Sequence, residues 1–163
     1  MKILLKIQTA LTALLVMTLV NCYSQPSDKV ESLMNEIVKK HDGKDGISCL
    51  TVAKGSGLNL IKAMLNKEFG RDFMKGVNSI TLIEYSDASE ETCKALHKDL
   101  DGFLSLLQEF DASEEKQFAD NDFVRCFASA ADEESGIISD FVIAMEDEKS
   151  KVLIYMAGKI KVE

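Results

Sequence analysis

The sequence predicts an α+β fold, in which three helices lie mainly on one face of a mixed sheet of about five strands. The first observation is a C-terminal block of three apolar, β-branched segments at residues 123–130, 137–146 and 151–160. Short polar breaks separate these segments, so the sheet should end in a three-strand antiparallel meander. The second observation is that helical and strand-like segments precede this block. Strands gathered at one end of a chain favour the α+β class.

Three segments have the apolar periodicity of amphipathic helices. The first begins at Ser27, a good N-cap residue, and reaches residue 41 with apolar side chains three and four residues apart. The second covers residues 58–69 and ends before Gly70. The third follows Asp87, which together with Glu90 resembles a capping box, and reaches about residue 107. The apolar stripe of this third helix consists of Cys93, Leu96, Leu100, Phe103, Leu104 and Leu107.

Two further strands are predicted between the helices, at residues 47–54 and 78–85, because both segments are rich in apolar and β-branched side chains. The acidic stretch 109–122 predicts a loop with a short edge strand. The order is then helix, strand, helix, strand, helix and three strands. If the strands flanking the second and third helices are parallel, both crossovers should be right-handed.

Length and charge limit the classes of function. A chain of 163 residues favours one domain, with 19 Lys and Arg against 27 Asp and Glu and a formal net charge of −8. Removal of an N-terminal leader that contains Lys2 and Lys6 makes the net charge more negative. Such a chain repels phosphate backbones, so nucleic-acid binding is not expected. The same charge disfavours docking on anionic lipid through a basic patch.

Residues 1–24 have the pattern of a signal peptide, and residues 25–163 then form a single α+β domain. Two lysines precede an apolar core of about ten residues, which is too short to span a bilayer. Cleavage before Gln25 gives a periplasmic or secreted protein. Alternatively, the sequence ending at Cys22 resembles a lipobox, and lipidation of Cys22 gives a membrane-anchored lipoprotein. Contact with the membrane is expected only in that second case.

Few residues are candidates for chemistry. Cys93, His97 and Asp101 are spaced i, i+4 and i+8 on the third helix, a pattern that suits a nucleophile with its base, or a metal site. Cys93 lies on the apolar stripe, however, where a free thiol behaves as a small apolar group. We therefore expect no catalytic residue, no cofactor and no metal. Cys49 and Cys126 can form a disulfide if their strands are neighbours.

Several stretches carry a resemblance to a known family. They are the turn at residues 42–46 with the strand that follows, the run 80–83 before an acidic helix start, and the closing strands at 140–146 and 152–158. In these features the chain resembles domain-of-unknown-function family 4252, which comprises small exported proteins of Gram-negative bacteria. The insertion of Gly55, Ser56 and Gly57 departs from the pattern. The resemblance implies a fold and an exported compartment, and no catalytic residues.

These observations predict an exported, non-enzymatic domain that binds an envelope protein. A small-ligand carrier with a pocket between sheet and helices is one alternative, and a Cys/His-dependent enzyme is another. Strict alternation places bulky residues such as Phe141, Ile143 and Met145 on one face of the meander, which should pack under the helices. The other face should be open and bind the partner. Its residues are Val124, Ala128, Val142, Ala144, Leu153 and Tyr155.

Overall fold

The computed structural model describes residues 27–69, 74–110, 123–132, 137–147 and 150–161. Within these ranges the chain forms an α+β structure with three helices, as predicted. The helices are α2 (Ser27–His41), α3 (Ser56–Phe69) and α4 (Glu90–Leu104). The strands are β1 (Ser48–Val52), β2 (Gly76–Glu84), β3 (Gln108–Phe110), β4 (Phe123–Ala128), β5 (Ala130–Asp132), β6 (Ile137–Glu146) and β7 (Lys151–Lys161).

The strands form one sheet in the order β1-β2-β7-β6-β4-β3, and the short strand β5 pairs with β6 beside this path. Every pair is antiparallel, so the prediction of a mixed sheet is wrong. A helix between two strands usually forms the crossover that joins a parallel pair. Here α3 instead joins β1 and β2, which are antiparallel neighbours in the sheet. The predicted meander is confirmed, because β4 pairs with β6 and β6 with β7.

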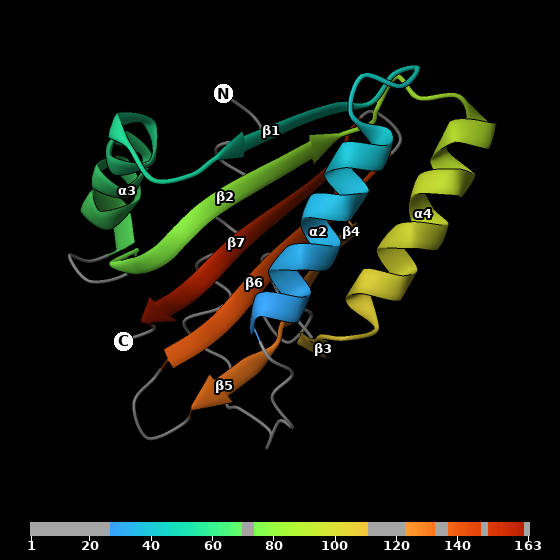
Figure 1. Cartoon of the computed structure of the whole chain (residues 1–163). Coiled ribbons are helices and arrows are strands. Elements are labelled where there is room, and N and C mark those ends of the chain that lie inside the picture. Colours follow the sequence, from blue (N-terminus) through green and yellow to red (C-terminus); the bar gives the residue numbers. More distant parts are fainter. Residues whose placement is uncertain (1–26, 70–73, 111–122, 133–136, 148–149, 162–163) are drawn as a thin grey trace.

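Two of the three helices cover the same face of the sheet. Helices α2 and α4 lie side by side across it, whereas α3 lies apart from them where β1 ends and β2 begins (Figure 1). Helix α4 begins later than predicted. Its N-cap is Ser89, whose hydroxyl accepts a hydrogen bond from the Thr92 amide at 3.3 Å, and the Asp87 capping box is not formed.

A helix-covered core lies between the sheet and helices α2 and α4. The apolar stripes of the two helices meet inward-facing residues of β2, β4, β6 and β7 there. The rings of Phe103 and Tyr155 pack edge to face with centroids 5.6 Å apart. The buried members are Val30, Met34, Ile37, Ile47, Ile83, Tyr85, Cys93, Leu96, Leu100, Phe103, Phe127, Val142, Leu153, Tyr155 and Ala157.

The six residues predicted to form an open partner-binding face do not share a face. Val142, Leu153 and Tyr155 are buried in the helix-covered core, and Ala144 packs against it. Val124 and Ala128 belong instead to a second cluster on the opposite face. The pairing of β4 with β6 explains why Val124 lies on the other face. Val124 pairs with Met145, and paired residues point to the same side of a sheet. The predicted assignment of the two faces is thus reversed.

The second cluster holds the bulky side chains that we expected under the helices. Its buried members are Met74, Val77, Cys126, Ala128, Ile138, Phe141, Ile143, Met145, Val152, Ile154, Met156 and Ile160. A β-bulge at Asp140 interrupts the alternation of β6, so that Ile138 and Phe141 point to the same face although they are three residues apart. Asp140 adopts a positive φ of 52° at this bulge.

Cys49 and Cys126 are both free thiols. Three strands, β2, β7 and β6, separate β1 from β4 in the sheet, a distance of about 19 Å at the usual strand spacing. A disulfide requires Cα atoms less than about 7 Å apart. Burial raises the pKa of Cys49 to about 11 and that of Cys126 to about 12, so both remain thiols at neutral pH.

Candidate functional site

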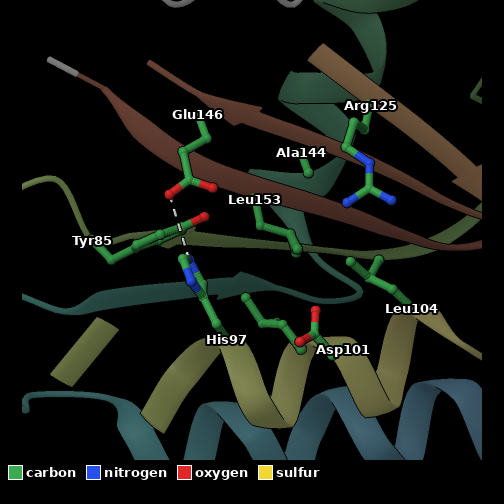
Figure 2. Close-up of a pocket in the computed structure, with 9 residues that line it drawn as sticks. Tyr85, His97, Asp101, Leu104, Arg125, Ala144, Glu146 and Leu153 are labelled. Carbon is green, nitrogen blue, oxygen red and sulfur yellow. Dashed lines mark ion pairs between the residues drawn. The ribbon is translucent and has the colours of Figure 1, made fainter. Parts of the chain in front are cut away.

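A pocket of about 150 Å³ lies between α4 and the surface of strands β4, β6 and β7 (Figure 2). Its floor is apolar, with side chains from the helix on one side and from the sheet on the other. Charged and aromatic side chains stand around this floor. The lining residues are Tyr85, His97, Leu100, Asp101, Leu104, Arg125, Ala144, Glu146 and Leu153.

One end of the pocket is formed by Tyr85, His97 and Glu146. The His97 Nε2 atom lies 3.6 Å from Glu146 Oε1, which is too long for a hydrogen bond. This nitrogen is shielded from solvent and has no hydrogen-bond partner among the described residues. The Tyr85 and His97 rings meet edge to face, with centroids 5.6 Å apart. Burial and the negative charge of Glu146 raise the pKa of Tyr85, so its phenol stays protonated.

The other end of the pocket holds Arg125, from β4, and Asp101, from α4. The guanidinium donates two hydrogen bonds to Glu109, of 2.6 and 2.8 Å, and it stacks 4.8 Å above the centroid of the Phe127 ring. The hydrogen bonds to Glu109 raise the pKa of Arg125, which is therefore always charged. Arg125 is thus held in place by a bidentate ion pair, and its charge is balanced before any ligand binds.

The structure separates the three residues that the sequence suggested for catalysis or metal binding. His97 and Asp101 line the pocket, whereas Cys93 is buried in the helix-covered core and does not line it. The Cys93 thiol contacts the Ala88 carbonyl at 3.7 Å, and the Lys151 ammonium lies 3.9 Å from Cys93 Sγ. In the described part of the chain, no group of three or more His, Cys, Asp or Glu is placed to hold a metal ion.

Three lining residues were not predicted from the sequence. Tyr85 follows β2, Arg125 lies on β4 and Glu146 ends β6, so they are up to 61 positions apart in the chain. The pairing of β2 with β7, of β7 with β6 and of β6 with β4 brings them to one place. The sequence indicated His97 and Asp101 by their helical spacing, and Ala144 and Leu153 by the alternation of their strands.

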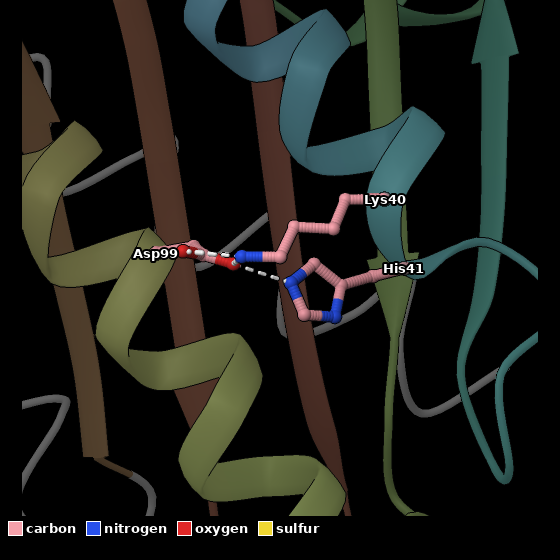
Figure 3. Close-up of polar contacts among 3 residues, drawn as sticks. All are labelled: Lys40, His41 and Asp99. Carbon is pink, nitrogen blue, oxygen red and sulfur yellow. Dashed lines mark hydrogen bonds and ion pairs between the residues drawn. The ribbon is translucent and has the colours of Figure 1, made fainter.

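A second polar cluster joins the two helices. His41, which is fully buried at the end of α2, lies with Nε2 2.6 Å from Asp99 Oδ2 on α4, and the Lys40 ammonium lies 2.7 Å from the same oxygen (Figure 3). The hydrogen bonds from His41 and Lys40 hold the pKa of the Asp99 carboxyl below its usual value. The cluster joins α2 to α4, and within the described part of the chain it has no further acidic or basic partner that would suggest chemistry.

We expect Asp99→Asn to lower the free energy of unfolding by about 1 kcal/mol at pH 7, because two charge-assisted hydrogen bonds at a partly exposed site are weakened. A depressed folded pKa means that this stabilisation is complete above the unfolded pKa of about 3.9 and is lost as the pH falls through the folded value. The difference between the two proteins should therefore shrink below about pH 4 in urea denaturation.

Glu90→Gln is the matched control for this measurement, because it removes an exposed ion pair with Lys94 within one turn of α4. Its effect should stay below about 0.5 kcal/mol. If the Asp99→Asn variant is as stable as the wild type at pH 7, the cluster does not stabilise the packing of α2 against α4.

The exposed apolar surface lies elsewhere, on the segment from β1 to α3. Leu50, Leu60 and Met64 are the large apolar side chains that the described residues expose, with exposed fractions of 59%, 64% and 53%. Leu60 and Met64 are one turn apart on α3. We call these three residues the β1–α3 surface. Residues 47–67, which include this surface, contain three lysines and no Asp or Glu, although the chain as a whole is acidic.

The chain matches no family model, no curated protein and no solved structure. The resemblance to family 4252 therefore stays a prediction. Within the described ranges, no helix has the length and apolar character needed to cross a membrane. The predicted signal peptide and Cys22 lie outside the described residues.

Proposed function

We propose that this protein is an exported, non-enzymatic domain that binds a protein of the cell envelope through its β1–α3 surface. The observation that carries the proposal is the grouping of Leu50, Leu60 and Met64 within one short segment of the chain. Large exposed apolar side chains that form one patch are typical of partner sites, and Leu60 and Met64 lie one turn apart on α3. Export rests on the leader sequence, with cleavage before Gln25 and lipidation at Cys22 as the two processing routes.

The charge of this segment indicates the chemistry of the partner. Lys54 and Lys62 lie close in sequence to the apolar residues, and the nearest acids in the chain are Asp45 and Glu68. A partner with an apolar centre and an acidic rim is therefore complementary to it, and such a partner would be repelled by the remainder of this acidic protein. The affinity should fall as the salt concentration rises.

Side-chain docking suits the geometry better than addition of a strand. β1 is one of the edge strands of the sheet, and edge strands offer free backbone groups to other chains. The Cys49 amide, however, already donates to the Asp42 carboxylate at 3.0 Å, so this five-residue edge is partly capped. The partner therefore engages Leu50, Leu60 and Met64 rather than extending the sheet.

The test is a pull-down from the native envelope with the wild-type domain and the double variant Leu60→Asp/Met64→Asp. We expect the variant to lose at least about 90% of a captured protein that the wild type retains, because two carboxylates replace the apolar contact and repel an acidic rim. The wild-type capture should weaken between low and high salt. Both exposed positions should tolerate the change without a large loss of thermal stability.

Ala95→Asp is the matched control, because Ala95 is an exposed apolar residue on a different helix, α4. This variant should capture the same protein as the wild type. If the double variant is folded and captures the protein unchanged, the β1–α3 surface is not the docking site. If Ala95→Asp loses the capture as well, the effect comes from net charge and the proposal fails.

The pocket beside α4 favours a second candidate function, a small-ligand carrier. It lies between sheet and helix and combines an apolar floor with charged side chains, a composition found in ligand sites. A Cys/His-dependent enzyme has less support, since Cys93 is buried away from the pocket that His97 lines.

A further inference from the structure

We infer that the pocket lined by Tyr85, His97, Asp101 and Glu146 binds the primary ammonium group of a short alkyl chain. This inference names the ligand of the carrier candidate and does not depend on the β1–α3 surface. It rests on three properties of the pocket: the sign of its charge, its apolar floor and a ring nitrogen of His97 that makes no hydrogen bond to any described residue.

Negative charge dominates around the pocket. Arg125 is the one guanidinium among the described lining residues. It is hydrogen-bonded to the Glu109 carboxylate, with Asp101 at the same end of the pocket and Glu146 at the other. Lys151 stands opposite Glu146 in the β6–β7 ladder, but its ammonium contacts Cys93 Sγ and the residue does not line the pocket. The electrostatic potential of the pocket is therefore negative, so the pocket attracts a cation and repels a carboxylate or phosphate.

The end formed by His97 and Glu146 suits an ammonium group. With its proton on Nδ1, His97 presents Nε2 as an acceptor, and this atom lies 3.6 Å from Glu146 Oε1 (Figure 2). Two acceptors at that separation can share one ammonium nitrogen at about 2.9 Å from each. Glu146 has a side-chain exposed fraction of 43%, so its carboxylate can turn to admit the group. The Tyr85 ring beside His97 offers a further attraction to the cation.

The floor of the pocket suits the alkyl part of the ligand. Leu100, Leu104, Ala144 and Leu153 line it and offer no hydrogen-bonding side chain. A cavity of this size, about 150 Å³, holds a molecule of roughly six non-hydrogen atoms, since an engineered apolar cavity of that volume takes up benzene. A chain of four or five carbons with a terminal ammonium therefore fits, whether it is a free amine or the side chain of a lysine.

Titration of the folded domain with n-butylammonium chloride, followed by amide NMR shifts, tests the inference. We expect saturable shifts at Tyr85, His97 and Leu153, and at least about tenfold weaker binding of butyrate and of n-butanol, which lack the positive charge. Nα-acetyl-lysine methylamide in a parallel titration distinguishes the two sources. Tighter binding of this compound assigns the site to a lysine side chain, and tighter binding of butylammonium assigns it to a free amine.

Glu146→Gln and Asp101→Asn are the test variants, and Glu36→Gln on the exposed side of α2 is the control. Glu146→Gln should weaken butylammonium binding at least about tenfold, Asp101→Asn should weaken it less, and Glu36→Gln should leave it unchanged. The inference is overturned if butylammonium gives no saturable shift, if butyrate or butanol binds the wild type equally well, or if both folded test variants bind like the wild type. Because no envelope protein takes part, this failure is distinct from failure of the docking proposal.

Discussion

Gly158→Ala is expected to destabilise the protein by about 3 kcal/mol or more. Gly158 lies in β7 with a φ of 109°, a conformation that residues with a Cβ atom rarely adopt. A Cβ at this position would overlap the carbonyl oxygen of Gly76 on the neighbouring strand β2 and crowd the amide of Asn78. Relief requires the β2–β7 ladder to move, and this ladder is central to the sheet. Backbone strain and steric overlap therefore act together.

Gly102→Ala is the matched control, with the opposite sign. Gly102 lies within helix α4, and a Cβ there meets no atom within 4 Å. The variant should be more stable by about 0.5–1 kcal/mol, since alanine favours the helix and glycine does not. Urea denaturation of both variants measures the contrast. If Gly158→Ala is as stable as the wild type, β7 does not approach β2 as closely as the structure has it.

The sequence predicted the elements better than their arrangement. The stripe through Cys93, Leu96 and Leu100 correctly gave the buried side of α4, because one helix turn fixes which side chains share a face. The sheet could not be predicted in the same way. Alternation divides a strand into two faces without saying which face the helices cover, and both faces of β6 and β7 are apolar here.

Asp140 explains why the alternation itself also failed. This carboxylate is fully buried and accepts hydrogen bonds from Ser129 Oγ at 2.8 Å and from the Tyr155 hydroxyl at 3.0 Å. Burial and the Asp140 charge raise the pKa of Tyr155, so the phenol remains a donor. These hydrogen bonds satisfy the buried carboxylate of Asp140, which lies at the β-bulge of β6. The bulge places Ile138 on the same face as Phe141. A periodic pattern contains no sign of such a bulge.

The sequence predicted only parts of the candidate pocket: helical spacing indicated two residues of α4, and alternation placed Ala144 and Leu153 on one predicted binding face. His97 and Asp101 could be paired because four residues separate them on one helix. Arg125 and Glu146 reach the same pocket through the pairing of β4 with β6, in which Arg125 stands opposite Ala144 and Phe123 opposite Glu146. Strand pairing is a long-range property, so no local pattern could place these two side chains beside α4.

Val142→Asp should unfold the protein or lower its stability by about 4 kcal/mol or more, because it places a carboxylate in the helix-covered core. Val142 is fully buried, pairs with Phe127 and Tyr155 across the two neighbouring strands, and has no basic side chain among these partners. An unpaired charge in such a place loses its hydration without compensation. Thermal melting followed by circular dichroism measures the loss.

Leu50→Asp is the matched control, because it makes the same kind of change at an exposed position of edge strand β1. Its side chain keeps its hydration, and a charge on an edge strand is well tolerated, so the melting temperature should fall by no more than a few degrees. The pair of variants decides the orientation of the sheet. A stable Val142→Asp protein would place Val142 in solvent and restore the open face that alternation alone predicted. An unfolded Val142→Asp protein beside a folded Leu50→Asp protein leaves the β1–α3 surface as the exposed apolar surface that the described residues offer to a partner.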